Sequence, residues 1–148
     1  MRKEDKDLLL KDLCSRLPYR VKCERYGKAY ELVEIDIKRG LVYVLRNDWY
    51  TPTSLPYSIK RNDDIRPYLR PMSSMTEEEK KEYIEYAGYD IEESVNGRHY
   101  EFYLKDLCGT SDNPSVNVSG IDWLNSHHFD YRGLIERGLA LEAPKDMY

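Results

Sequence analysis

Pro18 separates a stretch of helical periodicity from a stretch with a period of two. Before it, apolar residues recur at helical spacing and predict a helix over 5–17. The apolar face comprises Leu9, Leu10, Leu13, Cys14 and Leu17, and most charged residues, including Asp12 and Arg16, are expected on the opposite face. From Tyr19 apolar and charged residues alternate, which is typical of a half-buried strand. The chain therefore combines a helix with a sheet.

Four more short strands are predicted after this first one, over 30–37, 41–45, 57–60 and 65–66. In the first of these four, the apolar set changes parity between Leu32 and Val33 and continues through Ile35 and Ile37. One inserted residue restores an inward face after such a slip, so a β-bulge is predicted there. Residues 49–56, with two prolines, are expected to form a surface loop. Five strands at this spacing favour a small, bent antiparallel sheet or an SH3-like barrel, with the first helix across it.

The second half begins with a stretch that proline restricts. Residues 67–71, PYLRP, are predicted to form an extended strap between a first part, 1–71, and a second part, 72–148. Thr76 and Glu79 have the spacing of a capping box, which predicts a helix over 77–87 that ends at Gly88. Its apolar stripe is narrow, so the helix should lie on the surface. The stripe consists of Tyr83, Ile84 and Ala87.

The remaining residues predict an α+β fold whose two parts pack together. Asn96-Gly97 favours a type I′ turn in a hairpin over 90–104, and residues 108–120 are expected to be a loop. Two short helices are predicted over 121–127 and 131–137, the second capped by Asp130 and ended by Gly138. Their expected apolar side comprises Trp123, Leu124, Leu134 and Ile135. A last short strand is predicted over 139–141.

Composition limits the classes of function. The three cysteines include no C-x-x-C pair, so we expect reduced thiols, no disulfide framework and no cysteine zinc site. No apolar run approaches the roughly 20 residues that cross a bilayer, and no signal peptide is recognisable, so the sequence indicates a cytoplasmic protein without a membrane partner. Residues 1–75 hold 16 basic and 11 acidic side chains, whereas 76–148 hold 7 and 16. This asymmetry disfavours a nucleic acid wrapped around the whole molecule.

Three segments carry a resemblance to a known group of proteins. They are LLLKDLCSRLP over 8–18, YLRPMSSMTEEEKK over 68–81 and DWLNSHHFDYRGLIERGLALEAP over 122–144. They resemble segments of uncharacterised proteins that are encoded by phages and mobile elements of anaerobic gut bacteria. The resemblance implies a setting rather than an activity, because no enzyme chemistry and no binding residues come with it. Small phage accessory proteins often bind a host protein or sequester a small molecule, sometimes to counter host defence.

The first candidate site consists of His127, His128, Asp130 and Arg132. Adjacent helical residues point about 100° apart, so the two imidazoles should not share a metal ion while both are helical, and no metal site is predicted. One histidine oriented by Asp130 could act as a general acid or base in a hydrolase or nucleotide-modifying enzyme. The alternative is purely structural, with one histidine packed and one exposed beside a capping aspartate. The sequence favours this alternative.

The second candidate site is a basic stretch that contains Lys60, Arg61, Arg66 and Arg70. Arginine binds phosphate through two nitrogens and tyrosine stacks on bases, so this stretch could bind nucleic acid. We favour a simpler interpretation, in which these side chains pair with acidic residues of the second half.

The third candidate site is a surplus of aromatic residues. It comprises Trp49, Tyr50, Tyr57, Tyr83, Tyr86 and Tyr89. A short surface helix cannot bury three tyrosines at a spacing of three, so some should be exposed and available to a partner. The chain has no Walker loop, dinucleotide fingerprint, EF-hand or H-E-x-x-H motif, and no cofactor is predicted. The sequence therefore favours a non-enzymatic protein that binds a host protein or a small ligand, either as a monomer or as a homo-oligomer.

Overall fold

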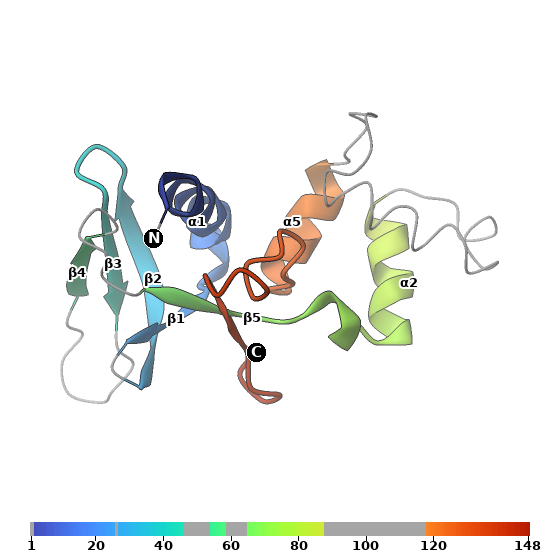
Figure 1. The fold of residues 1–148 in the computed structure, drawn as a ribbon. Helices are drawn as coiled ribbons and strands as arrows, with labels where there is room; N and C mark the ends of the chain where they lie inside the picture. The colour runs from blue at the N-terminus through green and yellow to red at the C-terminus, as the bar shows by residue number, and fades with distance from the viewer. Residues whose placement is uncertain (1, 26, 46–53, 59–64, 88–117) are drawn as a thin grey trace. The chain divides into compact units, whose positions relative to one another are not determined.

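The chain forms two compact units. A computed structural model describes residues 2–25, 27–45, 54–58, 65–87 and 118–148, with only the backbone of 54–58. The first unit comprises Met1–Leu69 and Leu134–Met147, and the second comprises Arg70–Gly133 and Tyr148. Helices and a sheet are both present, which confirms the predicted α+β class (Figure 1).

Helix α1 (Lys3–Arg16) opens the first unit and is followed by a 3-10 turn, η1 (Leu17–Tyr19). The prediction that Asp12 and Arg16 face away from the core is wrong. Both side chains are fully buried, with Arg16 Nε 2.8 Å from Asp12 Oδ2. The i,i+4 spacing lets the two charges neutralise each other within one helix, so they enter the interior as a pair.

In the part of the chain that the structure describes, six strands form one sheet in the order β4-β3-β2-β1-β5-β6. They are β1 (Lys22–Arg25), β2 (Lys28–Asp36), β3 (Leu41–Leu45), β4 (Ser54–Ser58), β5 (Arg66–Leu69) and β6 (Leu141–Glu142). Every neighbouring pair is antiparallel except β5 with β6, so the sheet is mixed rather than purely antiparallel. The order of the described strands is open, from β4 at one edge to β6 at the other, and they do not close into a barrel.

The predicted β-bulge in β2 is confirmed. Leu32 pairs with Val44 and Glu34 pairs with Tyr43, which leaves Val33 as the inserted residue. Leu32 is buried, whereas Val33 is 39% exposed. The inward face resumes at Ile35, which packs against the core, while Ile37 lies in the following turn and is 66% exposed.

Of two predictions about proline-containing stretches, one is confirmed in part and the other is wrong. The extended geometry predicted for 67–71 is present over 67–69, which belong to strand β5 with Pro67 opposite Cys23, and the boundary between the two units falls directly after these residues. Residues 54–56 of the predicted loop belong to β4, where Pro56 lies opposite Tyr43. Proline is tolerated near the start of a strand and on an edge strand, because there its missing N–H removes no ladder bond.

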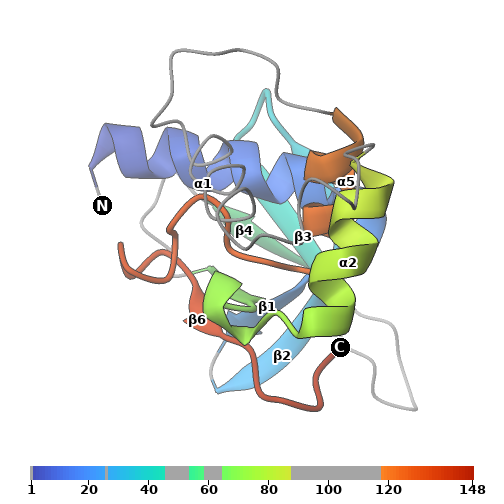
Figure 2. The same cartoon turned by 90° about the vertical axis from the view of Figure 1, so that its right-hand side faces the viewer.

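The core of the first unit lies between α1 and one face of the sheet (Figure 2). It comprises Leu9, Leu13, Val21, Cys23, Tyr30, Leu32, Val42, Val44, Ile65, Leu69, Leu134, Leu139 and Ala140. Cys23 is a free thiol within it, and Cys14 is half-buried and also free. Burial, and then the charge of Asp12, raise the pKa of the Cys23 thiol far above its ordinary value. This thiol is therefore an inert apolar group.

The second unit contains η3 (Met72–Ser74) and the helices α2 (Glu77–Tyr86) and α5 (Val118–Ser126), which lie side by side (Figure 1). The capping box of Thr76 and Glu79 is confirmed. The two helices are antiparallel, because Gly120 lies against Ala87 whereas Trp123 contacts Glu82. A Cβ at Gly120 would lie 3.1 Å from the Tyr83 hydroxyl oxygen, so this glycine permits the close approach.

The predictions for the C-terminal stretch are corrected in two respects. Helix α5 begins at Val118, inside the predicted loop. The predicted helix over 131–137 is wrong, since these residues form turns in which Gly133 has a positive φ of 68°. Consequently Asp130 caps no helix. The expected common apolar side is also divided, because Trp123 and Leu124 belong to the core of the second unit, whereas Leu134 and Ile135 belong to that of the first.

The remaining predictions have mixed outcomes. The buried stripe of α2 is confirmed, since Tyr83, Ile84 and Ala87 are all buried. The predicted last strand corresponds to the two residues of β6. The hairpin over 90–104 and the loop over 108–117 lie outside the described residues, as do Trp49, Tyr50, Lys60, Arg61 and Tyr89.

Candidate functional site

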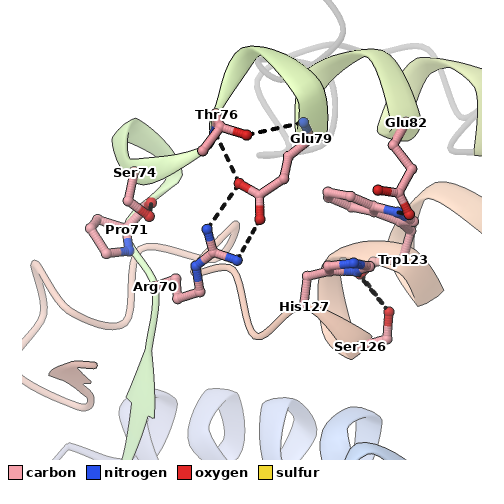
Figure 3. A network of polar contacts seen from close by, with 9 residues as sticks. All are labelled: Arg70, Pro71, Ser74, Thr76, Glu79, Glu82, Trp123, Ser126 and His127. Carbon is pink, nitrogen blue, oxygen red and sulfur yellow. Dashed lines mark hydrogen bonds and ion pairs between the residues drawn. The ribbon is translucent and has the colours of Figure 1, made fainter. Parts of the chain in front are cut away.

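The polar centre of the second unit is an ion pair between Arg70 and Glu79 (Figure 3). Arg70 Nη1 and Nη2 donate to the two carboxylate oxygens of Glu79 at 2.8 and 2.9 Å. Glu79 Oε2 also accepts the backbone N–H of Thr76 at 2.9 Å. The hydrogen bond from Arg70, assisted by the Thr76 N–H and by the charge of Arg70, lowers the pKa of Glu79. The first turn of helix α2 therefore carries a fixed, ionised carboxylate.

An aromatic stack lies beside this ion pair. The Trp123 indole is stacked with His127 at 3.9 Å between ring centroids and with Phe129 at 5.8 Å. The Arg70 guanidinium carbon lies 4.2 Å from the centre of the Phe129 ring, and Tyr83 meets Trp123 edge-on at 5.4 Å. Such pairs stabilise a core beyond the area that they bury. The stack fills the interior of this unit.

The two histidines have separate environments. His127 Nδ1 lies 2.9 Å from the Trp123 carbonyl oxygen, which can only accept, so Nδ1 carries the proton and Nε2 is the basic nitrogen. His128 has a left-handed backbone with φ 59° and stacks on Tyr148 at 3.7 Å. In the described part of the chain, no group of three or more His, Cys, Asp or Glu residues could hold a metal ion.

Asp130 and Arg132 differ from their predicted roles. The Asp130 side chain is buried, and its backbone N–H donates to the Arg70 carbonyl oxygen at 2.8 Å. Arg132 lies over the Tyr131 ring, with 5.1 Å between the guanidinium carbon and the ring centre. These contacts join the segment after α5 to the start of the unit, next to the Arg70–Phe129 bridge. Asp130 therefore contributes to the architecture of the unit.

The basic stretch is largely neutralised where it is described. Arg66 Nη2 lies 3.4 Å from Glu24 Oε2, and Arg70 is held by Glu79 through both terminal nitrogens. Arg70 pairs with an acidic residue of the second half, as the simpler interpretation of this stretch predicts, whereas Arg66 pairs with Glu24 of the first half and does not. Two arginines that already pair with carboxylates are poor phosphate ligands, because binding would first have to break these pairs.

The aromatic candidates are divided between core and surface. Tyr83 is 2% exposed, whereas Tyr86, on the same helix, is 56% exposed. Tyr57 lies in β4, of which only the backbone is described. Tyr86 is therefore the candidate aromatic side chain that the described residues place in solvent. Sequence reasoning missed two residues of this site, Phe129 and Glu82. It also missed the stacking of Trp123 on His127, which the i,i+4 spacing of these two residues could have indicated.

Comparison with known proteins gives no family for this chain. No protein-family model matches it, and neither a curated protein nor a solved structure matches it significantly. Among the described helices, none combines the length and the apolar character that a membrane span requires. A functional proposal for this protein therefore rests on the geometry of the site.

Proposed function

We propose that the protein is a non-enzymatic, phage-type accessory protein that binds a host protein through the exposed side of α2, with Tyr86 at the centre of the contact. The observation that carries this proposal is the 56% exposure of Tyr86 on a helix that otherwise buries its apolar side chains. A tyrosine ring offers a large apolar area with a polar end at a small entropic cost, and it is enriched at binding hot spots.

A second exposed apolar residue supports the same location. Val118, the first residue of α5, is 72% exposed. Because α2 and α5 are antiparallel, the end of α2 that carries Tyr86 is the end of the pair at which α5 begins. Two exposed apolar side chains at one end of a helix pair are suited to contact the surface of a partner protein.

A host protein fits this location better than a small ligand does. Small ligands bind in concave, mostly apolar sites that enclose most of their surface, whereas Tyr86 projects from the outside of a helix. The resemblance to proteins encoded by phages and mobile elements is consistent with a host protein as the partner. A role in countering host defence is part of this proposal.

Site-specific photo-crosslinking in host cells tests the proposal. A photoreactive amino acid at position 86 should form a discrete covalent adduct with a host protein. The same amino acid at Lys28, an exposed position at the start of β2, is the matched control and should not form it. An adduct of equal yield from both positions, or none from position 86, would contradict the proposal.

One observation supports a second function, a hydrolase or nucleotide-modifying enzyme. The Trp123 carbonyl fixes the tautomer of His127 and leaves Nε2 available as a base. Such an enzyme would lose its activity in His127→Gln and keep it in His128→Gln, because the two rings lie in separate stacks. Equal loss from both substitutions would remove His127 as the base.

A further inference from the structure

The exposed side of α2 is acidic as well as aromatic. Glu78, Glu82 and Glu85 recur at intervals of four and three residues, so they form a stripe along one side of the helix. Tyr86 lies four residues after Glu82 and therefore beside it on this side. All four residues are exposed. A partner that contacts Tyr86 must also meet this row of carboxylates, which we call the acidic stripe.

Within the described residues, no ion pair closer than 4 Å neutralises the carboxylates of the acidic stripe. The side chains of Glu78 and Glu85 form no ion pair with the described residues, and Lys80 is bound to Glu77, outside the stripe, at 2.5 Å. Glu82 accepts a hydrogen bond from the Trp123 indole N–H at 3.3 Å, which leaves its negative charge uncompensated. Lys81 is the exposed cation of this helix and lies three residues after Glu78 and four before Glu85, so one positive charge stands beside the three carboxylates. The stripe therefore presents a negative potential around the tyrosine ring.

We propose that the partner contributes an arginine-rich basic segment, which lies along the acidic stripe and over the Tyr86 ring. This inference rests on the proposed binding function. Arginine satisfies both features of the surface, because its planar guanidinium pairs with carboxylates through two nitrogens and also stacks on an aromatic face. An acidic partner would place like charges together and would be excluded.

The hydrogen bond between Trp123 and Glu82 supplies an internal reporter of this contact. A guanidinium that pairs with Glu82 competes for the carboxylate oxygen that the indole N–H uses. The nuclear magnetic resonance signal of the indole N–H should therefore shift when the stripe is occupied. The chain has two tryptophans, so Trp49→Phe leaves a single indole signal.

The experiment titrates the full-length Trp49→Phe protein with a nonapeptide of arginine. We expect a saturable shift of the Trp123 indole signal and an affinity that falls by roughly tenfold between low and physiological salt, as the Debye length shortens. Glu82→Gln with Glu85→Gln should weaken binding by a similar factor, as should Tyr86→Ala, whereas Tyr86→Phe should retain it. The matched control, Glu4→Gln with Asp7→Asn, removes the same charge from exposed positions of α1.

Three outcomes would overturn the inference. The first is the absence of a saturable indole shift, and the second is a shift of the same size with a nonapeptide of glutamate. The third is equal weakening by the α1 control, which would mean that the peptide responds to net charge alone. A Tyr86→Ala protein with an unchanged amide spectrum outside α2 and α5 confirms that lost binding is not lost folding.

The crosslinking experiment separates this inference from the proposed function. A host protein could be crosslinked at position 86 through a peptide without basic residues, in a complex that resists about 0.5 M salt. This result would support the proposed binding function but would contradict the inference that the partner contributes a basic segment. The absence of a crosslink at position 86 would overturn both.

Discussion

Arg70 and Glu79 form a two-nitrogen, two-oxygen ion pair, at 2.8 and 2.9 Å, between the first residue of the second unit and the first turn of α2. The same carboxylate closes the capping box with Thr76. Arg70 in turn packs over Phe129, whose ring is stacked with Trp123. Glu79 thus joins helix capping to the aromatic stack, and its charge should matter to the stability of this unit.

Replacing Glu79 by Gln should destabilise the second unit by about 1–2 kcal/mol. Glutamine can still accept the Thr76 N–H, as capping boxes allow, but it cannot pair as an anion with Arg70. The estimate lies below that for a buried pair because both side chains are partly exposed. Urea denaturation monitored by Trp123 fluorescence in the Trp49→Phe protein measures the loss.

Glu78→Gln is the matched control for this substitution. It makes the same chemical change one residue earlier, on an exposed side chain without a described ion pair. The free energy of unfolding should change by no more than about 0.5 kcal/mol. Equal losses in the two variants would show that helix charge, rather than the Arg70 contact, stabilises the unit.

The stabilisation by Glu79 should disappear in acid. Its pKa in the folded protein is lowered, chiefly by the hydrogen bond from Arg70, so protonation is easier in the unfolded chain. Stability from the charged form is fully present above the ordinary glutamate pKa of about 4.3, and is lost as the pH falls through the lowered folded value. The difference in unfolding free energy between the parent and Glu79→Gln should be constant from about pH 5 to 8. A difference that persists at about pH 2 would contradict this assignment.

The buried pair of Asp12 and Arg16 should be costly to break but not to replace. Arg16→Met leaves the Asp12 carboxylate in the interior without its 2.8 Å partner, and should cost about 3–5 kcal/mol. The double substitution of Asp12→Leu and Arg16→Met removes both charges, and should restore most of that loss. Thermal and urea unfolding of the single and double variants test this coupling. A double variant that is less stable than the single one would contradict it.

Arg39→Met is the exposed control for the buried pair. Arg39 lies 3.6 Å from Asp36 in the turn after β2, with 73% of its side chain exposed. Solvent screens such a pair, so the substitution should cost less than about 1 kcal/mol. The contrast with Arg16 attributes the larger loss to burial.

Local periodicity predicts most elements of the first unit, because the signals lie within a few residues of each other. Three such local signals are the proline at position 18, the parity change at Val33 and the alternation of side chains in β3. The β5–β6 pairing is different, since it joins residues 66–69 to residues 141–142. Composition and spacing carry no signal for such a distant partner. The sequence therefore predicts the extended backbone of 67–71 but not its pairing with β6.

The candidate site could be predicted only in part. The capping box specifies Thr76 and Glu79 through their spacing, and it is present. Glu79 pairs with Arg70, which is nine residues away. This separation matches neither the spacing of helix neighbours nor that of residues on one face of a strand, so the sequence does not predict the pair. Asp12 and Arg16 show the same limit, because polarity predicts exposure for each residue separately whereas their pairing decides burial.

Deletion of Val33 tests the role of the bulge in β2. Val33 is the inserted residue between the pairs Leu32–Val44 and Glu34–Tyr43, so its removal should leave a regular ladder with Leu32 still inward. Deletion of Glu31 instead should move the residues before it by one position and turn Tyr30 from the core to solvent. We therefore expect a folded protein that loses at most about 2 kcal/mol without Val33, and loss of cooperative unfolding without Glu31. Urea unfolding distinguishes them, and equal damage by the two deletions would show that the bulge itself is required.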